Sequence, residues 1–308
     1  AGRPLMPTPC RELAMNMTER NVTEQISHSP TNGQAQRPVE LWWLPAVGAA
    51  LTIFLQIMWP LADGQQRTVL TIVTVMVFAG TSVAHAWLNF GAGWALSYLG
   101  ITFAFAFAIE AVGTGTGFPF SPYDYTSALG IQVLSVPLIV PLAWAMTAYP
   151  VLLLARRLTN ALGGGHAYRI TCSAIGALAM TAWDLFLDPQ MVSAGYWIWA
   201  PNPTSLPGVP GIPAVNYLGW LGASFVLMFL LSYLPARNVS EVVPATLWTW
   251  TWVGGIVSNA FFFDRPSVAF VGGVAMAVVT IPYLWLLITG RGDGTLSATE
   301  LSRQAASA

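Results

Sequence analysis

The sequence predicts an all-α protein: a polytopic membrane helix bundle of about eight transmembrane helices, with seven as the alternative count. Composition is the first reason, because 55% of the 308 residues are hydrophobic and only 8% are charged, whereas soluble domains carry about 25% charged residues. Mean hydropathy is also high, at +0.59. In addition, apolar runs near the roughly 20 residues needed to cross a bilayer recur along the chain.

In chain order, the first segment, 1–39, is polar and rich in Pro, Thr, Asn and Gln, so we expect a disordered tail. No apolar stretch precedes Leu41, which argues against a signal peptide. A transmembrane domain is expected over 40–290, and a second disordered tail over 291–308. The apolar runs of this domain lie at about 41–61, 68–90, 94–112, 129–155, 170–188, 213–234, 242–263 and 266–289.

The arginines predict the orientation of the bundle, with the N- and C-termini inside. On that topology Arg67 and Arg265 are the outside arginines, and the inside segments hold the others: Arg3, Arg11, Arg20, Arg37, Arg156, Arg157, Arg169, Arg237, Arg291 and Arg303. This distribution follows the positive-inside rule for a multi-pass protein, which we expect in the cell membrane.

Two long loops then share the outer side. The first, 113–128, begins with "GTGTG", which we expect to be either a segment of close backbone approach or an unwound segment that lines a cavity. The second, 189–212, is rich in proline, which predicts an irregular cap, and its aromatic residues suit an interfacial belt. Asp264 and Arg265 are expected to form an ion pair in a short turn.

Composition also excludes several classes of function. All twelve basic residues are arginine, and the absence of lysine excludes retinal Schiff-base proteins, pyridoxal enzymes and Walker A motifs. Three histidines are too few for the histidine clusters of membrane di-iron enzymes. Two cysteines do not make a disulfide framework. A net charge of −1 gives no electrostatic footprint for nucleic acid.

Asp184 and Asp188 are the sharpest signal of a functional site. At a spacing of four residues they share one face of a helix, and each costs roughly 2.5–3.5 kcal/mol to place in a membrane. One interpretation is a catalytic acid and base pair. The alternative is a pair in headgroup water, at a helix end enforced by Pro189.

Three further candidates accompany the pair. Glu110 ends the third apolar run and is either functional or an interfacial carboxylate. The stretch "YDY", Tyr123 to Tyr125, offers Asp124 as a further acid, or is an ordered turn. His85 is either a site residue or a hydrogen-bonded core histidine. On the predicted topology the acids all gather at one membrane face.

Longer motifs resemble a known family. The stretches "AWDLFLDPQMV", "GYWIW", "GIPAVNYLGW", "EAVGTGTGFPFSPYDYT" and "VPLIVPLAWAMTAYP" are similar to those of the integral-membrane carotenoid biosynthesis proteins. That family includes CruF-type carotenoid 1,2-hydratases and bisanhydrobacterioruberin hydratases. The resemblance covers roughly 41–290.

The resemblance implies hydration of the terminal 1,2 double bond of an acyclic carotenoid ψ-end, giving a tertiary alcohol. It implies a lipid-soluble carotenoid substrate within the bilayer, with other carotenoid biosynthesis enzymes as candidate partners. Water adds to such an alkene by protonation, formation of a tertiary cation and capture of that cation by water. This chemistry needs a general acid, a shielded aromatic pocket and a proton acceptor, and it requires no metal, flavin or nicotinamide cofactor.

We expect Asp184 or Glu110 to act as the acid, and Asp188 or Asp124 to orient and deprotonate the water. The expected substrate-binding residues are Trp183, Trp197, Trp199, Tyr123, Tyr125, His85, Phe118, Asn216 and Trp220.

Other functions stay open on sequence alone. The DxxxD spacing also suits Mg²⁺ and diphosphate in an elongase-type prenyltransferase, although a second acidic motif is not found. A cyclase would use the same protonation but exclude water. A carotenoid-binding or transport protein would need no chemistry at all.

Overall fold

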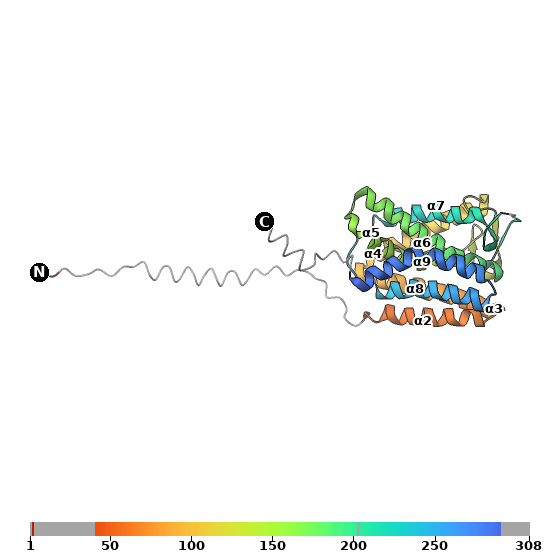
Figure 1. The fold of residues 1–308 in the computed structure, drawn as a ribbon, viewed down its shortest axis with the longest axis horizontal. Coiled ribbons are helices and arrows are strands. Elements are labelled where there is room, and N and C mark those ends of the chain that lie inside the picture. Colours follow the sequence, from red (N-terminus) through yellow and green to blue (C-terminus); the bar gives the residue numbers. More distant parts are fainter. Residues whose placement is uncertain (1, 3–40, 202–203, 291–308) are drawn as a thin grey trace. The chain divides into compact units, whose positions relative to one another are not determined.

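The computed structural model describes residue 2 and residues 41–201 and 204–290. Apart from Gly2, the predicted tails at 1–39 and 291–308 lie outside the described residues. The described bundle is made of helices that run side by side (Figure 1), which confirms the all-α prediction. They are α2 (Leu44–Met58), α3 (Gly64–Phe90), α4 (Ala92–Thr116), α5 (Ile139–Thr159), α6 (Gly165–Ser193), α7 (Ala214–Leu231), α8 (Val242–Val257) and α9 (Pro266–Thr289).

Within the described residues, 7 helices are long and apolar enough to cross a membrane, counting α2 together with the 3-10 turn Trp59–Leu61. Helix α8 has 16 residues, and a π-helical turn, Ser258–Phe262, continues it. The two predicted counts, eight and seven, therefore differ only in whether α8 is taken as a full span. Helix α2 begins and α9 ends at the same end of the bundle (Figure 1), whereas which end faces the cytoplasm stays a prediction.

The expected unwinding at "GTGTG" is wrong, because α4 continues to Thr116 and ends at Gly117, whose φ of 78° is left-handed. Backbone groups in a membrane have no water to bond, so an intact helix is favoured despite the glycines. The close-approach alternative holds at one of these glycines. A Cβ on Gly113 would lie 2.8 Å from the hydroxyl of Tyr123.

The expected helix end at Pro189 is also wrong, because α6 continues through Pro189 to Ser193. Asp188 therefore lies inside a helix and not at its terminus. The carbonyl of Pro189 accepts a hydrogen bond from Arg265 Nη1 at 2.9 Å. Arg265 is thus bonded to α6, and the ion pair expected with Asp264 is not among the contacts of the described residues.

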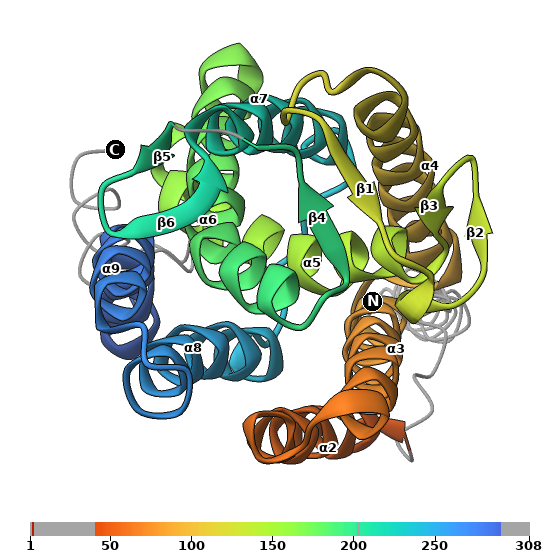
Figure 2. The same cartoon turned by 90° about the vertical axis from the view of Figure 1, so that its right-hand side faces the viewer.

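The first part of the fourth apolar run is a hairpin and not a helix. Strands β2 (Gln132–Val133) and β3 (Val136–Pro137) pair across Leu134 and Ser135, which have φ of 50° and 63°. Two positive φ values at the centre of a two-residue loop match the twist of a hairpin. Helix α5 consequently begins at Ile139 and lies among α3, α4, α6 and α7 (Figure 2).

The two long loops lie at the same end of the bundle, as predicted, and they pair there. Strand β1 (Tyr123–Tyr125) is antiparallel to β4 (Trp197–Trp199), and Figure 2 shows them crossing that end. Strand β5 (Ser205–Leu206) pairs with β6 (Val209–Pro213). The second loop is thus built of strand pairs, and not the irregular cap expected from its prolines.

Candidate active site

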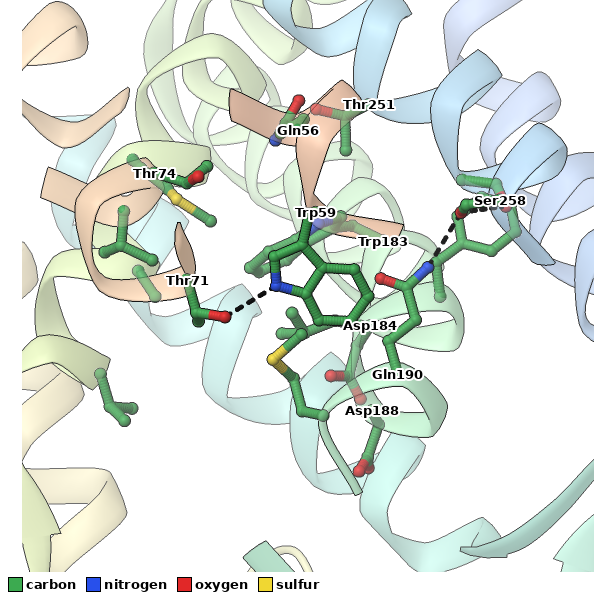
Figure 3. A pocket seen from close by; sticks show the side chains of 18 of the residues that line it. Gln56, Trp59, Thr71, Thr74, Trp183, Asp184, Asp188, Gln190, Thr251 and Ser258 are labelled. Carbon is green, nitrogen blue, oxygen red and sulfur yellow. Dashed lines mark hydrogen bonds between the residues drawn. The ribbon is translucent and has the colours of Figure 1, made fainter. Parts of the chain in front are cut away.

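A cavity of about 440 Å³ opens inside the bundle, and the three acids predicted from the apolar runs all line it. Asp184 and Asp188 come from α6 and Glu110 from α4, and each of the three is buried. Figure 3 shows part of this cavity, with Asp184 and Asp188 on one helix and the indole of Trp59 among the other lining side chains. Helices α2 and α8 form a further wall.

Glu110 is held by donors from two other elements. Its Oε2 accepts hydrogen bonds from the hydroxyls of Tyr123 at 2.5 Å and Tyr125 at 2.9 Å. Its Oε1 accepts one from Trp144 Nε1 on α5 at 3.1 Å. The two tyrosines reach the same carboxylate because residues i and i+2 of a strand point to one face. Both oxygens of Glu110 are therefore engaged.

Asp188 is held in the same way by the partner strand. Trp197 Nε1 and Trp199 Nε1, on one face of β4, donate to Oδ1 at 2.8 and 3.0 Å. Asn216 Nδ2, on α7, donates to Oδ2 at 2.7 Å. The pairing of β1 with β4 thus delivers four donors to two carboxylates on different helices.

Asp184 differs from the other two acids in how few donors it has. Asn216 Nδ2 donates to its Oδ2 at 2.9 Å, so one amide joins both aspartates. In the described part of the chain its other carboxyl oxygen accepts no hydrogen bond, although the side chain is buried and lines the cavity. Asp184 therefore keeps an oxygen for a ligand.

Tyr123 and Tyr125 lie on β1, outside the membrane-spanning helices. Burial, followed by the nearby charge of Glu110, raises the pKa of both phenols above the usual range for tyrosine. Both groups consequently stay protonated and remain hydrogen-bond donors.

Aromatic rings surround the acids. Trp144 and Trp220 are stacked, with ring centroids 4.3 Å apart and planes inclined by 5°. Trp183 meets Trp220 edge-on at 6.0 Å, and the rings of Tyr123 and Trp199 lie 5.0 Å apart. Ring faces attract cations, so the cavity combines carboxyl groups with surfaces that can stabilise positive charge.

Most of the predicted site residues meet in this cavity. It is lined by Glu110, Tyr123, Tyr125, Trp183, Asp184, Asp188, Trp197, Trp199, Asn216 and Trp220. The aromatic residues of the second loop do not form the interfacial belt expected of them. Trp197 and Trp199 donate hydrogen bonds to Asp188. Tyr196 is buried, and its hydroxyl lies 3.0 Å from that of Thr71.

Three predicted residues lie elsewhere. Asp124 is exposed on β1, between the two tyrosines that point inward, because the strand alternates its faces. Phe118 is also exposed, and neither residue lines the cavity. His85 is buried in α3 with Nδ1 2.7 Å from the hydroxyl of Tyr149, which confirms the core-histidine alternative.

Sequence reasoning missed Trp144 and the wall made by α2 and α8. Trp144 lies in the motif "VPLIVPLAWAMTAYP" that carried the resemblance, but no polar spacing marks it as a partner of Glu110. The wall residues, such as Ile57 and Val253, are ordinary apolar residues of spanning helices. Only their place in space identifies them.

Comparison with known proteins identifies the family. The model of the family described as carotenoid biosynthesis protein matches residues 69–283. Over 190 residues the chain is 31% identical to a bisanhydrobacterioruberin hydratase of Haloarcula japonica, an alignment that spans 60% of each protein. No solved structure matches the chain. The match over most of the spanning region confirms the resemblance seen in the motifs: this multi-pass membrane protein belongs to the carotenoid biosynthesis protein family.

Proposed function

We propose that the protein hydrates the terminal 1,2 double bond of an acyclic carotenoid ψ-end, with Asp184 as the general acid and without a cofactor. The observation that carries this assignment is that Asp184 lines the cavity and has one carboxyl oxygen with no donor among the described residues. The similarity to a protein named as a hydratase supports the reaction class.

The donors distinguish the three acids. Glu110 and Asp188 each accept three hydrogen bonds, which stabilise a carboxylate and occupy both of its oxygens. Asp184 accepts one, from the amide that also bonds Asp188. A proton shared by two neighbouring carboxyls is therefore best placed on Asp184, whose second oxygen has no donor among the described residues.

In the first step, the carboxyl proton of Asp184 passes to the less substituted carbon of the terminal double bond. The π electrons form the new C–H bond, and the other alkene carbon becomes a tertiary cation. The indoles of Trp144, Trp183 and Trp220 line the same cavity as the acids, and a ring face that is open to the cavity would stabilise this charge.

In the second step, a water molecule attacks the cation and forms the C–O bond. The proton that the water loses passes to Asp188, and its return to Asp184 across the pair bonded by Asn216 restores the starting state. One water is added and no electron is transferred, so the reaction balances without an oxidant, a reductant or a metal.

The cavity disfavours the elongase-type alternative. Three acids line it, and no arginine, lysine or histidine of the described residues does, so a diphosphate would be repelled. The side-chain amide of Asn216 also bonds one oxygen of each aspartate and would compete there with Mg²⁺.

The test is expression in a carotenoid-free bacterium that makes lycopene and γ-carotene, followed by chromatography and mass spectrometry of the pigments. We expect a more polar product heavier by one water, which is lost in Asp184→Asn and kept in the matched control Asp124→Asn. A product of unchanged mass would favour a cyclase. Unchanged pigments would contradict the proposal and favour carotenoid binding.

A further inference from the structure

One wall of the cavity reaches the surface of the bundle. Several large apolar side chains both line the cavity and are exposed, which means that the cavity opens between them. They are Ile57 on α2, at 46% exposure, and, from α8 and its π-helical turn, Val253 at 43%, Val257 at 41% and Phe262 at 51%. The acids on the opposite wall are buried, so the opening leads inward to them.

This opening is lateral. Ile57 belongs to a segment able to cross the membrane, Leu44–Leu61, and the exposed residues around the opening are hydrocarbon side chains. Side chains of this kind on the outside of a spanning bundle face lipid. A molecule passing between α2 and α8 would therefore come from the bilayer, which is where a carotenoid dissolves.

Each side of the opening is bonded to a different neighbour. After α2, Trp59 Nε1 donates to Thr71 Oγ1 on α3 at 2.7 Å. At the end of α8, Ser258 Oγ accepts from Gln190 Nε2 on α6 at 3.2 Å, as Figure 3 shows. No hydrogen bond joins α2 to α8 in the part of the chain that the structure describes, so the two sides can separate without breaking one.

The cavity is too small for a whole carotenoid. A volume of about 440 Å³ falls in the range that encloses a drug-sized ligand, whereas a carotenoid is a much longer chain. One end group fits beside Asp184, and the remaining polyene has to leave through an opening. The apolar opening between α2 and α8 matches the chemistry of that chain.

We propose that the carotenoid enters end-first from the bilayer through this opening, and that its polyene chain stays between α2 and α8 while the end group reacts. This inference rests on the proposed function for the reaction, although not for the binding path. A carotenoid with two ψ-ends must then leave and rebind to react at its second end.

The path is tested by narrowing the opening. Val253→Trp places a larger side chain at the opening, and Val242→Trp is the matched control, since Val242 is an exposed residue of the same helix that does not line the cavity. We expect Val253→Trp to lower both lycopene hydration and the amount of lycopene that co-purifies by about tenfold, as expected of a steric change in a pocket. Protein yield and the gel-filtration profile confirm folding of both variants.

The outcomes separate the two proposals. If the wild type hydrates lycopene and both variants do so equally, the entry path is wrong and the function stands. If the wild type binds lycopene without hydrating it, and only Val253→Trp loses the pigment, the function is wrong and the path stands. If the wild type neither binds nor hydrates lycopene, both are wrong.

A time course gives an independent measurement. With lycopene in excess over the protein, we expect the singly hydrated product to accumulate first and to exceed the amount of protein. Doubly hydrated product as the main species from the earliest times would overturn rebinding, because it would mean that both ends react in one encounter.

Discussion

Asn216 donates to Asp184 and Asp188 at 2.9 and 2.7 Å, so a single side-chain amide bridges the carboxyls of the two aspartates. It is buried at the start of α7, and it approaches α6 because these two helices pack together. In the proposed mechanism Asn216 transfers no proton and acts as a positioning residue for the two acids.

Asn216→Leu should leave both carboxyls short of a donor while keeping the branched shape of the side chain. We expect the hydration rate to fall by at least about tenfold, because a hydrogen bond to a charged group is worth about 1.5–3 kcal/mol. Initial rates with lycopene measure this. Asn216→Asp, which removes the donor and adds a fourth acid to the cavity, should be no better, and a wild-type rate in either variant would contradict the positioning role.

Tyr125→Phe removes one of the donors to Glu110, and Tyr123 and Trp144 remain. Because burial and Glu110 raise the pKa of Tyr125, its phenol stays neutral beyond the usual tyrosine value of about 10. We therefore expect a lower hydration rate in the variant. When the rate is measured against pH, the alkaline limb of the profile should be the same as in the wild type. An alkaline limb that is present in the wild type and lost in Tyr125→Phe would mean that this phenol titrates during catalysis.

At the scale of elements, α6, α8 and α9 meet at Phe186, which fits only because glycines face it. A Cβ on Gly255 or on Gly272 would lie 2.5 or 2.6 Å from the ring. Gly272→Ala is expected to destabilise the bundle by about 1–3 kcal/mol through overpacking. Gly222→Ala, where a Cβ meets nothing within 4 Å, is the control. The midpoint of thermal unfolding in detergent is measured for both variants. Equal midpoints for Gly272→Ala and Gly222→Ala would contradict the tight packing at Phe186.

The pairing of β1 with β4 is the other element on which the site depends. Ile198 is exposed and faces Asp124 across the pair, with Trp197 and Trp199 on either side of it. Ile198→Pro should disturb the strand and displace both indoles from Asp188. We expect the activity to be lost with the helical content by circular dichroism unchanged, whereas Ile198→Thr should keep both. Full activity in the proline variant would show that the strand pair is dispensable.

For the molecule as a whole, the sequence predicted the spanning helices well, because hydrocarbon imposes length and apolarity on each of them. It predicted Asp184, Asp188 and Glu110 because acids in apolar runs are costly. The unwinding at "GTGTG" and the helix end at Pro189 were wrong, because there local propensity and the membrane's demand for bonded backbone oppose each other. The hairpin before α5 was missed because its apolar residues were counted as part of a spanning run. Asp124 was predicted to join the site but does not line the cavity, because the alternation of faces along a strand in this loop was not predicted.

The organisation of the whole bundle explains why the site needs every part of it. The acids come from α4 and α6, their donors from α5, α7 and the two paired loops, and the opening from α2 and α8. None of these long-range approaches follows from spacing along the chain. They depend on which helices are neighbours, and that was not predicted.

The central claim is that water adds to a carotenoid end group through Asp184. Purified protein incubated with lycopene in water enriched in oxygen-18 tests it most directly, with mass spectrometry of the product. We predict a product heavier by one water that carries the labelled oxygen, formed equally by the wild type and Asp124→Asn, and absent with Asp184→Asn. A product of unchanged mass, or equal labelled product from Asp184→Asn, would contradict the account.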